Sequence, residues 1–215
     1  MICVFSRPIP LVLLLAFCTF IPILVAAVSV VQIPLGALPE DSLRLAAESV
    51  TFFLHALAGV LFGVLGPMQF VLALRRRFGV LHRVIGRVFA LAGLMLALSG
   101  LRLLFQVESR STELLDVARG AFSLALILAL ALGVMAARAR DLKKHRAWMI
   151  RAYVIGMGAG TIALVMFPIY LVTGAPMTGL ASDIVFVSWW LANIALGEWI
   201  IRQLAAPTRR QAAVA

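Results

Sequence analysis

Apolar residues occur along this chain in long, nearly unbroken stretches separated by short polar segments. Six stretches cover about 9–31, 49–74, 83–105, 114–137, 148–172 and 184–204. Because a bilayer core of roughly 30 Å needs about 20 apolar residues per helix, each stretch predicts one transmembrane helix. Barrel strands alternate apolar and polar residues, so these continuous runs exclude a β-barrel. The pattern predicts an all-α polytopic membrane helical bundle of six transmembrane helices, forming a single integral membrane domain over residues 1–215.

Composition agrees with this fold class, since 63% of the residues are hydrophobic, 13% are charged, and the mean hydropathy is +1.07. Soluble domains carry about a quarter charged residues. The first run follows Arg7 and ends near Ala26, which leaves a cleavable signal peptide as an alternative to a retained helix. Its apolar stretch is longer than a typical signal segment, and this length favours the retained helix.

Charge predicts the orientation, because Lys and Arg near span ends gather on the cytoplasmic side. With both termini inside, 15 of the 19 basic residues fall on that side, and Arg44, Arg102, Arg110 and Arg119 fall outside. The sequence therefore predicts a multi-pass protein of the bacterial inner membrane, N-in and C-in. Tryptophan agrees, with Trp148 and Trp199 predicted near inner span ends and Trp189 and Trp190 near the outer end of the last span.

The two basic loops share a pattern at a constant offset of 63 residues. Arg75, Arg77, His82 and Arg83 recur as Arg138, Arg140, His145 and Arg146. If this is a duplication, spans two and three correspond to spans four and five as a parallel internal repeat. The repeat would place spans two to five in a four-helix core, with spans one and six peripheral. A chance match between two loops selected for positive charge is the alternative.

A repeat would place His82 and His145 at equal depth on opposite sides of an axis, as two axial ligands of one b-type haem require. Four arginines could pair with the haem propionates, and four glycines could leave room for a flat cofactor. These are Arg83, Arg87, Arg146 and Arg151, and Gly86, Gly156, Gly158 and Gly160. The competing interpretation is that basic residues at a span end contact anionic lipid, and that small-residue patterns pack helices.

Three further polar residues lie within apolar spans, where ionisable groups are functional candidates. His55 has Arg102, Arg119 or an outer acid as possible partners, with a backbone carbonyl as the alternative. Glu198 follows Asn193 by five residues and could pair with Arg202 or with an arginine of the basic loops. No catalytic nucleophile with an oriented base is visible, so no catalytic residue is assigned.

Three segments resemble a known family. They are LHRVIGRVFALAG (Leu81–Gly93), KHRAWMIRAY (Lys144–Tyr153) and VSWWLANIALGEW (Val187–Trp199). In that order and spacing they resemble the prokaryotic membrane family known as domain of unknown function 2306. The resemblance implies motif positions but no activity. These positions are His82, Arg83, Gly86, Arg87, His145, Arg146, Trp148, Met149, Arg151, Asn193 and Glu198. Helix count and histidine placement also resemble transmembrane cytochrome b and ferric-reductase-like bundles, by architecture only.

The leading functional hypothesis is membrane electron transfer through one b-type haem near the cytoplasmic face. A quinone near His55 or a redox partner protein would then exchange electrons with the haem, and the bilayer is the remaining partner. One alternative is a non-enzymatic membrane module that binds anionic lipid or a partner subunit through its basic face. The other is a transporter of protons or a small solute that uses His55 and Glu198. No soluble stretch is long enough to form a basic nucleic-acid-binding domain.

Overall fold

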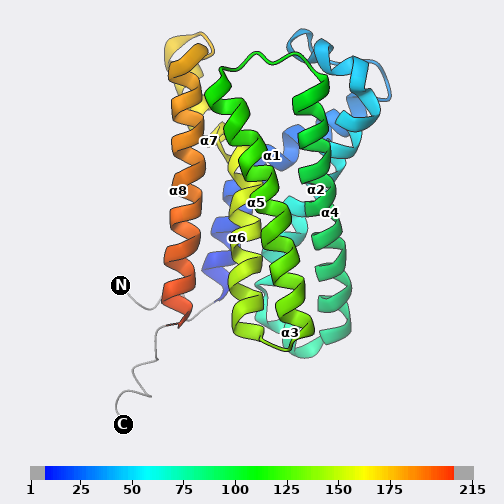
Figure 1. Ribbon diagram of the computed structural model, residues 1–215, viewed down its shortest axis with the longest axis vertical. Coiled ribbons are helices and arrows are strands. Elements are labelled where there is room, and N and C mark those ends of the chain that lie inside the picture. Colours follow the sequence, from blue (N-terminus) through cyan, green and yellow to red (C-terminus); the bar gives the residue numbers. More distant parts are fainter. Residues whose placement is uncertain (1–7, 206–215) are drawn as a thin grey trace.

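A computed structural model describes residues 8–205, with side chains from residue 17 onward except those of residues 41, 72 and 73. In this part of the chain all regular structure is helical. The elements in order are α1 (Pro8–Gln32), η1 (Glu40–Glu48), α2 (Ser49–Gln69), α3 (Leu72–Arg77), α4 (Gly79–Gln106), α5 (Glu113–Arg138), α6 (Leu142–Thr161), α7 (Ala163–Thr173) and α8 (Gly179–Ala205). The long helices run up and down along one axis, and α1 begins at the end of the bundle where α8 ends (Figure 1).

Five helical stretches are long and apolar enough to cross a membrane. They are Ser42–Gln69, Gly79–Gln106, Glu113–Arg138, Leu142–Thr173 and Gly179–Ala205. They match the predicted second to sixth spans. The predicted first span coincides with α1, but the side chains of residues 8–16 lie outside the described residues, and the rest forms only a shorter apolar helix, Phe17–Gln32. The structure is thus an all-helical bundle with five candidate spans.

Several helix ends differ from the apolar runs. The run over 49–74 is not one helix, because α2 ends at Gln69 after Pro67, and the chain turns through Phe70 and Val71 into the short α3. The fifth stretch starts earlier than predicted, at Leu142, and is interrupted at Ile162 between α6 and α7. Pro168 lies within α7, six residues after this break. Hydropathy marks lipid-facing length and cannot show such turns.

The buried core is contributed by α2, α4, α5 and α6 and centres on three aromatic rings. Phe62 of α2 stacks on Phe89 of α4 with ring centroids 4.4 Å apart, and Tyr153 of α6 lies 5.8 Å from Phe62. Phe62 is fully buried. Its ring lies between Gly93 of α4 and Gly156 of α6, and a Cβ atom at either glycine would lie 2.7 Å or less from the ring. These glycines therefore let the backbones approach around a large side chain.

Helix α8 also packs through a large side chain that lies against a glycine. Trp190 of α8 fills the space beside Gly158 and donates from Nε1 to the Ile155 carbonyl at 2.7 Å. Trp190 is only 6% exposed, so its side chain packs inside the bundle and does not face lipid. Hydropathy placed α8 in the membrane but could not show that this face packs on α6.

The first helix packs against glycines of two other helices. On α1, Ile23 lies against Gly63 of α2, and Pro22 lies against Gly160 of α6. The small-residue pattern at Gly59 and Gly63 thus serves helix packing, as the competing interpretation of these patterns held.

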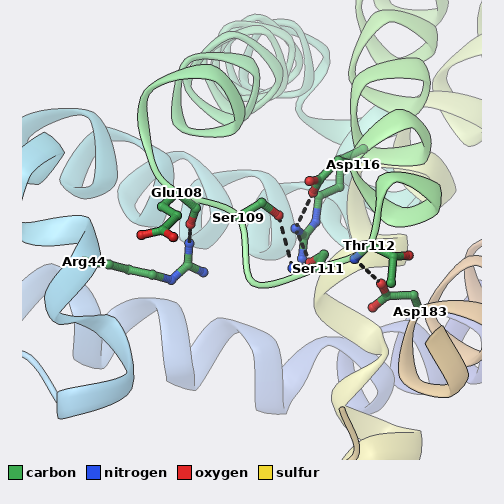
Figure 2. Close-up of polar contacts among 8 residues, drawn as sticks. Arg44, Glu108, Ser109, Ser111, Thr112, Asp116 and Asp183 are labelled. Carbon is green, nitrogen blue, oxygen red and sulfur yellow. Dashed lines mark hydrogen bonds and ion pairs between the residues drawn. The ribbon is translucent and has the colours of Figure 1, made fainter. Parts of the chain in front are cut away.

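Polar contacts hold the loop between α4 and α5 at the end of the bundle where α1 finishes (Figure 2). Arg44 of η1 donates to the Glu108 carbonyl at 2.8 Å. The backbone N–H of Thr112 donates to Asp183 of α8 at 2.6 Å, and Asp183 is only 4% exposed. Arg119 donates to Ser111 at 2.8 Å and pairs with Asp116 at 3.2 Å. The loop thereby ties η1, α5 and α8 together.

Replacement of Gly66 by alanine tests the aromatic core. A Cβ atom there would overlap the Tyr153 ring, so Gly66→Ala should destabilise the protein by about 1–3 kcal/mol. The measurement is thermal unfolding in detergent. The matched control is Gly120→Ala, whose Cβ would meet only Leu104 at 3.7 Å and whose helix propensity improves. A Gly66→Ala protein as stable as the control would contradict this account of the core.

Candidate functional site

The candidate site lies at the basic end of the bundle, defined by the ends of α2, α3, α5 and α8 and the starts of α4 and α6. His82 and His145 each lie in the first turn of a long helix. The His82 N–H donates to the Phe78 carbonyl, and the His145 N–H donates to the Asp141 carbonyl, both at 2.9 Å. Each of these carbonyls belongs to the residue that precedes the helix. The two histidines therefore occupy equivalent local positions.

The start of α6 is fixed by Asp141. Its carboxylate accepts from the Lys144 backbone N–H at 3.0 Å and pairs with Lys144 Nζ at 3.1 Å. These contacts with Lys144 hold the pKa of Asp141 below its usual range. A carboxylate in this position satisfies a free N–H group of the first turn and complements the helix dipole. The turn that carries His145 is therefore well anchored.

The ring of His145 is oriented by α5. Its Nδ1 lies 2.8 Å from the carbonyl oxygen of Gly133. A carbonyl can only accept, so Nδ1 carries the proton of a neutral ring and Nε2 keeps its lone pair. Gly133 also lets α5 and α6 approach closely, since a Cβ atom here would lie 2.6 Å from Met149 Sδ and that side chain would have to move. A histidine that binds a metal through Nε2 is commonly oriented by such a bond at its other ring nitrogen.

Two buried polar atoms at the basic end lack hydrogen-bond partners among the described residues. They are His82 Nδ1 and Gln69 Nε2. The Gln69 side chain lies against Gly86, one turn after His82, where a Cβ atom would be 3.2 Å from Oε1. His82 is also close enough to His145 and Arg75 for electrostatic interaction. Buried polar groups normally have partners, so an unpartnered pair marks a place where an additional group could bind.

The glycines that were predicted to leave room for a cofactor are instead packed by side chains. Phe62 occupies the space beside Gly156, Trp190 the space beside Gly158, and Pro22 the space beside Gly160. That expectation was wrong, because glycines in a membrane helix also admit the large side chains of neighbouring helices. The middle of the bundle is therefore closed, and space for a ligand has to be sought at the basic end.

The predicted arginines divide into three groups. Arg151 donates to both carboxylate oxygens of Glu198, at 2.5 and 2.9 Å, and lies 4.6 Å from the centroid of the Trp148 ring. Arg146 donates to the Leu204 carbonyl of α8 at 3.4 Å. Arg83 and Arg87 are exposed. The partner of Glu198 is thus an arginine across the bundle and not Arg202.

The other candidates lie apart from the histidine pair. His55 in α2 has Ser99 of α4 as its partner, with Nδ1 and Oγ 3.0 Å apart. The predicted partners of His55 are occupied elsewhere, since Arg102 pairs with Glu48 at 2.9 Å and Arg119 with Asp116. Asn193 donates to the Trp189 carbonyl of its own helix at 2.9 Å. Neither His55 nor Asn193 therefore belongs to the site at the basic end.

A groove of about 710 Å³ runs between α2 and α4 near His55. Its polar part is lined by Glu48, Thr51, Ser99 and Arg102, and its apolar part includes Leu54, Leu91, Leu94, Met95 and Leu98. Ser99 and His82 are 17 residues apart on α4, so the polar part lies about 25 Å from the histidine pair. The groove and the histidine pair are separate sites.

Comparison with known proteins identifies the family. The family model described as "Predicted membrane protein (DUF2306)" matches residues 52–201, well over half of the 215 residues. This chain belongs to the DUF2306 family. The matched residues of this DUF2306 protein include His82, His145 and Glu198. No curated protein and no solved structure matches the chain.

The side chains available as metal ligands in this DUF2306 protein limit the kinds of metal site that it could form. Within residues 8–205, no group of three or more His, Cys, Asp or Glu side chains could hold a metal ion. A closed zinc site needs four such ligands. Haem iron needs only two axial imidazoles, and the pair His82 and His145 matches that requirement in type. The buried and unpartnered Nδ1 of His82, together with a His145 ring that is held through its own Nδ1, fits such a group in chemistry.

Sequence reasoning missed three residues of these sites. Gln69 is the only amide of its span, and a polar residue at the end of an apolar run was a usable signal. Ser99 adjoins Gly100 inside an apolar run, which also marked it. Gly133 could not have been found, because its role is a carbonyl oxygen that only the packing of α5 on α6 brings to His145.

Proposed function

We propose that this DUF2306 protein transfers electrons in the membrane through one b-type haem held by His82 and His145 at the basic end. The observation that carries the proposal is the buried Nδ1 of His82, which has no hydrogen-bond partner among the described residues. A bound haem supplies reversible one-electron chemistry at its iron. The Gly133 carbonyl orients the ring of His145 for this role.

The rest of the chain defines the surroundings of that group. The aromatic rings of Phe62, Phe89 and Tyr153 fill the middle of the bundle, so a haem would have to lie at the basic end. Arg151 and Arg146 have protein partners, which leaves the exposed Arg83 and Arg87 for the two propionates. Exposed cations at this end also suit an acidic redox partner protein.

An absorption spectrum of the purified protein, oxidised and then reduced with dithionite, tests the haem proposal. We expect about one haem b per chain by pyridine haemochrome, and its loss in His82→Ala and in His145→Ala. The matched control is His55→Ala, which removes the remaining histidine and should keep the spectrum. Colourless protein from haem-replete cells, or haem retained in both variants, would overturn the proposal. Size-exclusion chromatography shows whether each variant is folded.

A quinone is the small-molecule partner that we assign to the groove between α2 and α4. Glu48 and Arg102 neutralise each other through a bidentate pair at its polar part, so the groove suits a neutral head group with an apolar tail. Leu94→Trp should fill the groove and reduce the amount of bound short-chain quinone several-fold in equilibrium dialysis. Leu128→Trp on α5, at a similarly lipid-facing position outside the groove, is the control. Equal binding by both variants would refute this assignment.

We also propose that the protein crosses the bacterial inner membrane six times, with α1 as a retained span and the basic end in the cytoplasm. The charge asymmetry supports this orientation. A fluorescent protein fused after Arg140 should fluoresce, and alkaline phosphatase fused after Ser109 should be active, because the first reporter folds only in the cytoplasm and the second only outside it. A fusion at residue 35 distinguishes a retained α1 from a cleaved segment by size. Reversed activities would contradict the orientation.

The competing functions differ in what favours them. Transport through His55 and Glu198 gains nothing from the geometry, because Glu198 is paired with Arg151 and lies at the basic end, whereas His55 lies near the opposite end beside Ser99. The membrane module that binds anionic lipid is favoured by the basic end itself. Among the described residues, Arg75, Arg76, Arg77, Arg83, Arg87, Arg138, Arg140 and Lys143 are exposed there.

A further inference from the structure

A small pocket of about 150 Å³ lies between α6 and α8 at the basic end. These two helices lie side by side along the bundle (Figure 1). The pocket is lined by Lys143, Arg146, Ala147, Ile150, Ile201, Leu204 and Ala205. Its lining thus combines two cationic side chains with an apolar wall, and it contains no acidic residue.

The positive charge of this pocket is not neutralised by the nearby acids. Asp141 is held by Lys144, and both oxygens of Glu198 are held by Arg151. Arg146 donates to the Leu204 carbonyl only at the long distance of 3.4 Å, which orients its guanidinium toward the pocket and leaves further N–H groups free. The side chain of Lys143 is exposed, and among the described residues its ammonium group forms no ion pair. Both side chains are therefore available to an anion.

The position of the pocket indicates a lipid. Lys143 and Arg146 lie in the first turns of α6, and Leu204 lies in the last turn of α8, so the pocket lies where a transmembrane segment meets the head groups. The wall formed by Ile150, Ile201 and Leu204 suits acyl chains and would contribute nothing to a free inorganic anion. Basic pockets between membrane helices bind anionic head groups in this way.

We infer that the pocket between α6 and α8 binds the phosphate group of an anionic phospholipid, with Arg146 and Lys143 as its ligands. This inference does not depend on haem, because Arg146 faces α8 and takes no part in the histidine site. The volume is sufficient for a phosphodiester and too small for a porphyrin. Binding at this seam would bridge α6, which carries His145, to α8.

Thermal unfolding in detergent with added lipid tests the inference. Dioleoylphosphatidylglycerol should raise the unfolding temperature more than dioleoylphosphatidylcholine does, because only the first is anionic. In Lys143→Gln with Arg146→Gln, the apparent affinity for phosphatidylglycerol should fall about tenfold or more. The matched control is Arg138→Gln with Arg140→Gln, which removes the same charge from the same end but outside the pocket. The control should lose less than about threefold in affinity.

Three outcomes would overturn the inference. Equal losses in the two double variants would show a diffuse basic surface and no discrete site. Absence of a preference for phosphatidylglycerol would exclude recognition of the charge. Stabilisation by millimolar inorganic phosphate as large as that by phosphatidylglycerol would identify a free anion and not a lipid as the ligand. If the pocket variant does not fold, the single variants Lys143→Gln and Arg146→Gln are compared with Arg138→Gln in the same titration, by the same criteria.

Discussion

The packing of aromatic side chains against glycines is the interaction on which the rest of this bundle depends. Lipid tails are as apolar as leucine, so helices in a membrane are held together by close fit and not by exclusion of water. Phe62 lies between Gly93 and Gly156, Tyr153 lies against Gly66, and Trp190 lies against Gly158. These contacts join α2 to α4, α2 to α6 and α6 to α8, and together they set the distances among these four helices.

This packing also decides where chemistry can occur. Three rings fill the middle of the bundle, and the histidine pair and the groove between α2 and α4 lie toward opposite ends. At the basic end, the close approach of α5 and α6 at Gly133 brings a carbonyl oxygen to His145, and the end of α2 brings Gln69 to the histidine-bearing turn of α4. At the opposite end, the loop between α4 and α5 is held by Arg44 and Asp183. The site is thus a consequence of which helices approach closely.

Ion pairs also hold helices of this bundle together. Ion pairs link helices within the membrane region, as Arg151 and Glu198 link α6 to α8 and Arg102 and Glu48 link α4 to the start of α2. Breaking such a pair would leave a charge partly desolvated. The remaining cations at the basic end are exposed. The same end therefore combines a histidine pair with a cationic surface around it.

The sequence by itself determined the class of the protein, the approximate spans, the clustering of cations at one end and the equivalent placement of His82 and His145, because hydropathy and charge depend on residue type alone. It also identified Glu198 as a residue with a charged partner. Only the tertiary structure decided that the partner is Arg151, that Trp190 is buried, that Gly156 and Gly158 hold aromatic rings, and that Ser99 accompanies His55. These features depend on how each helix is rotated about its axis and which neighbour it meets. A run of apolar residues around the whole helix leaves that rotation undetermined.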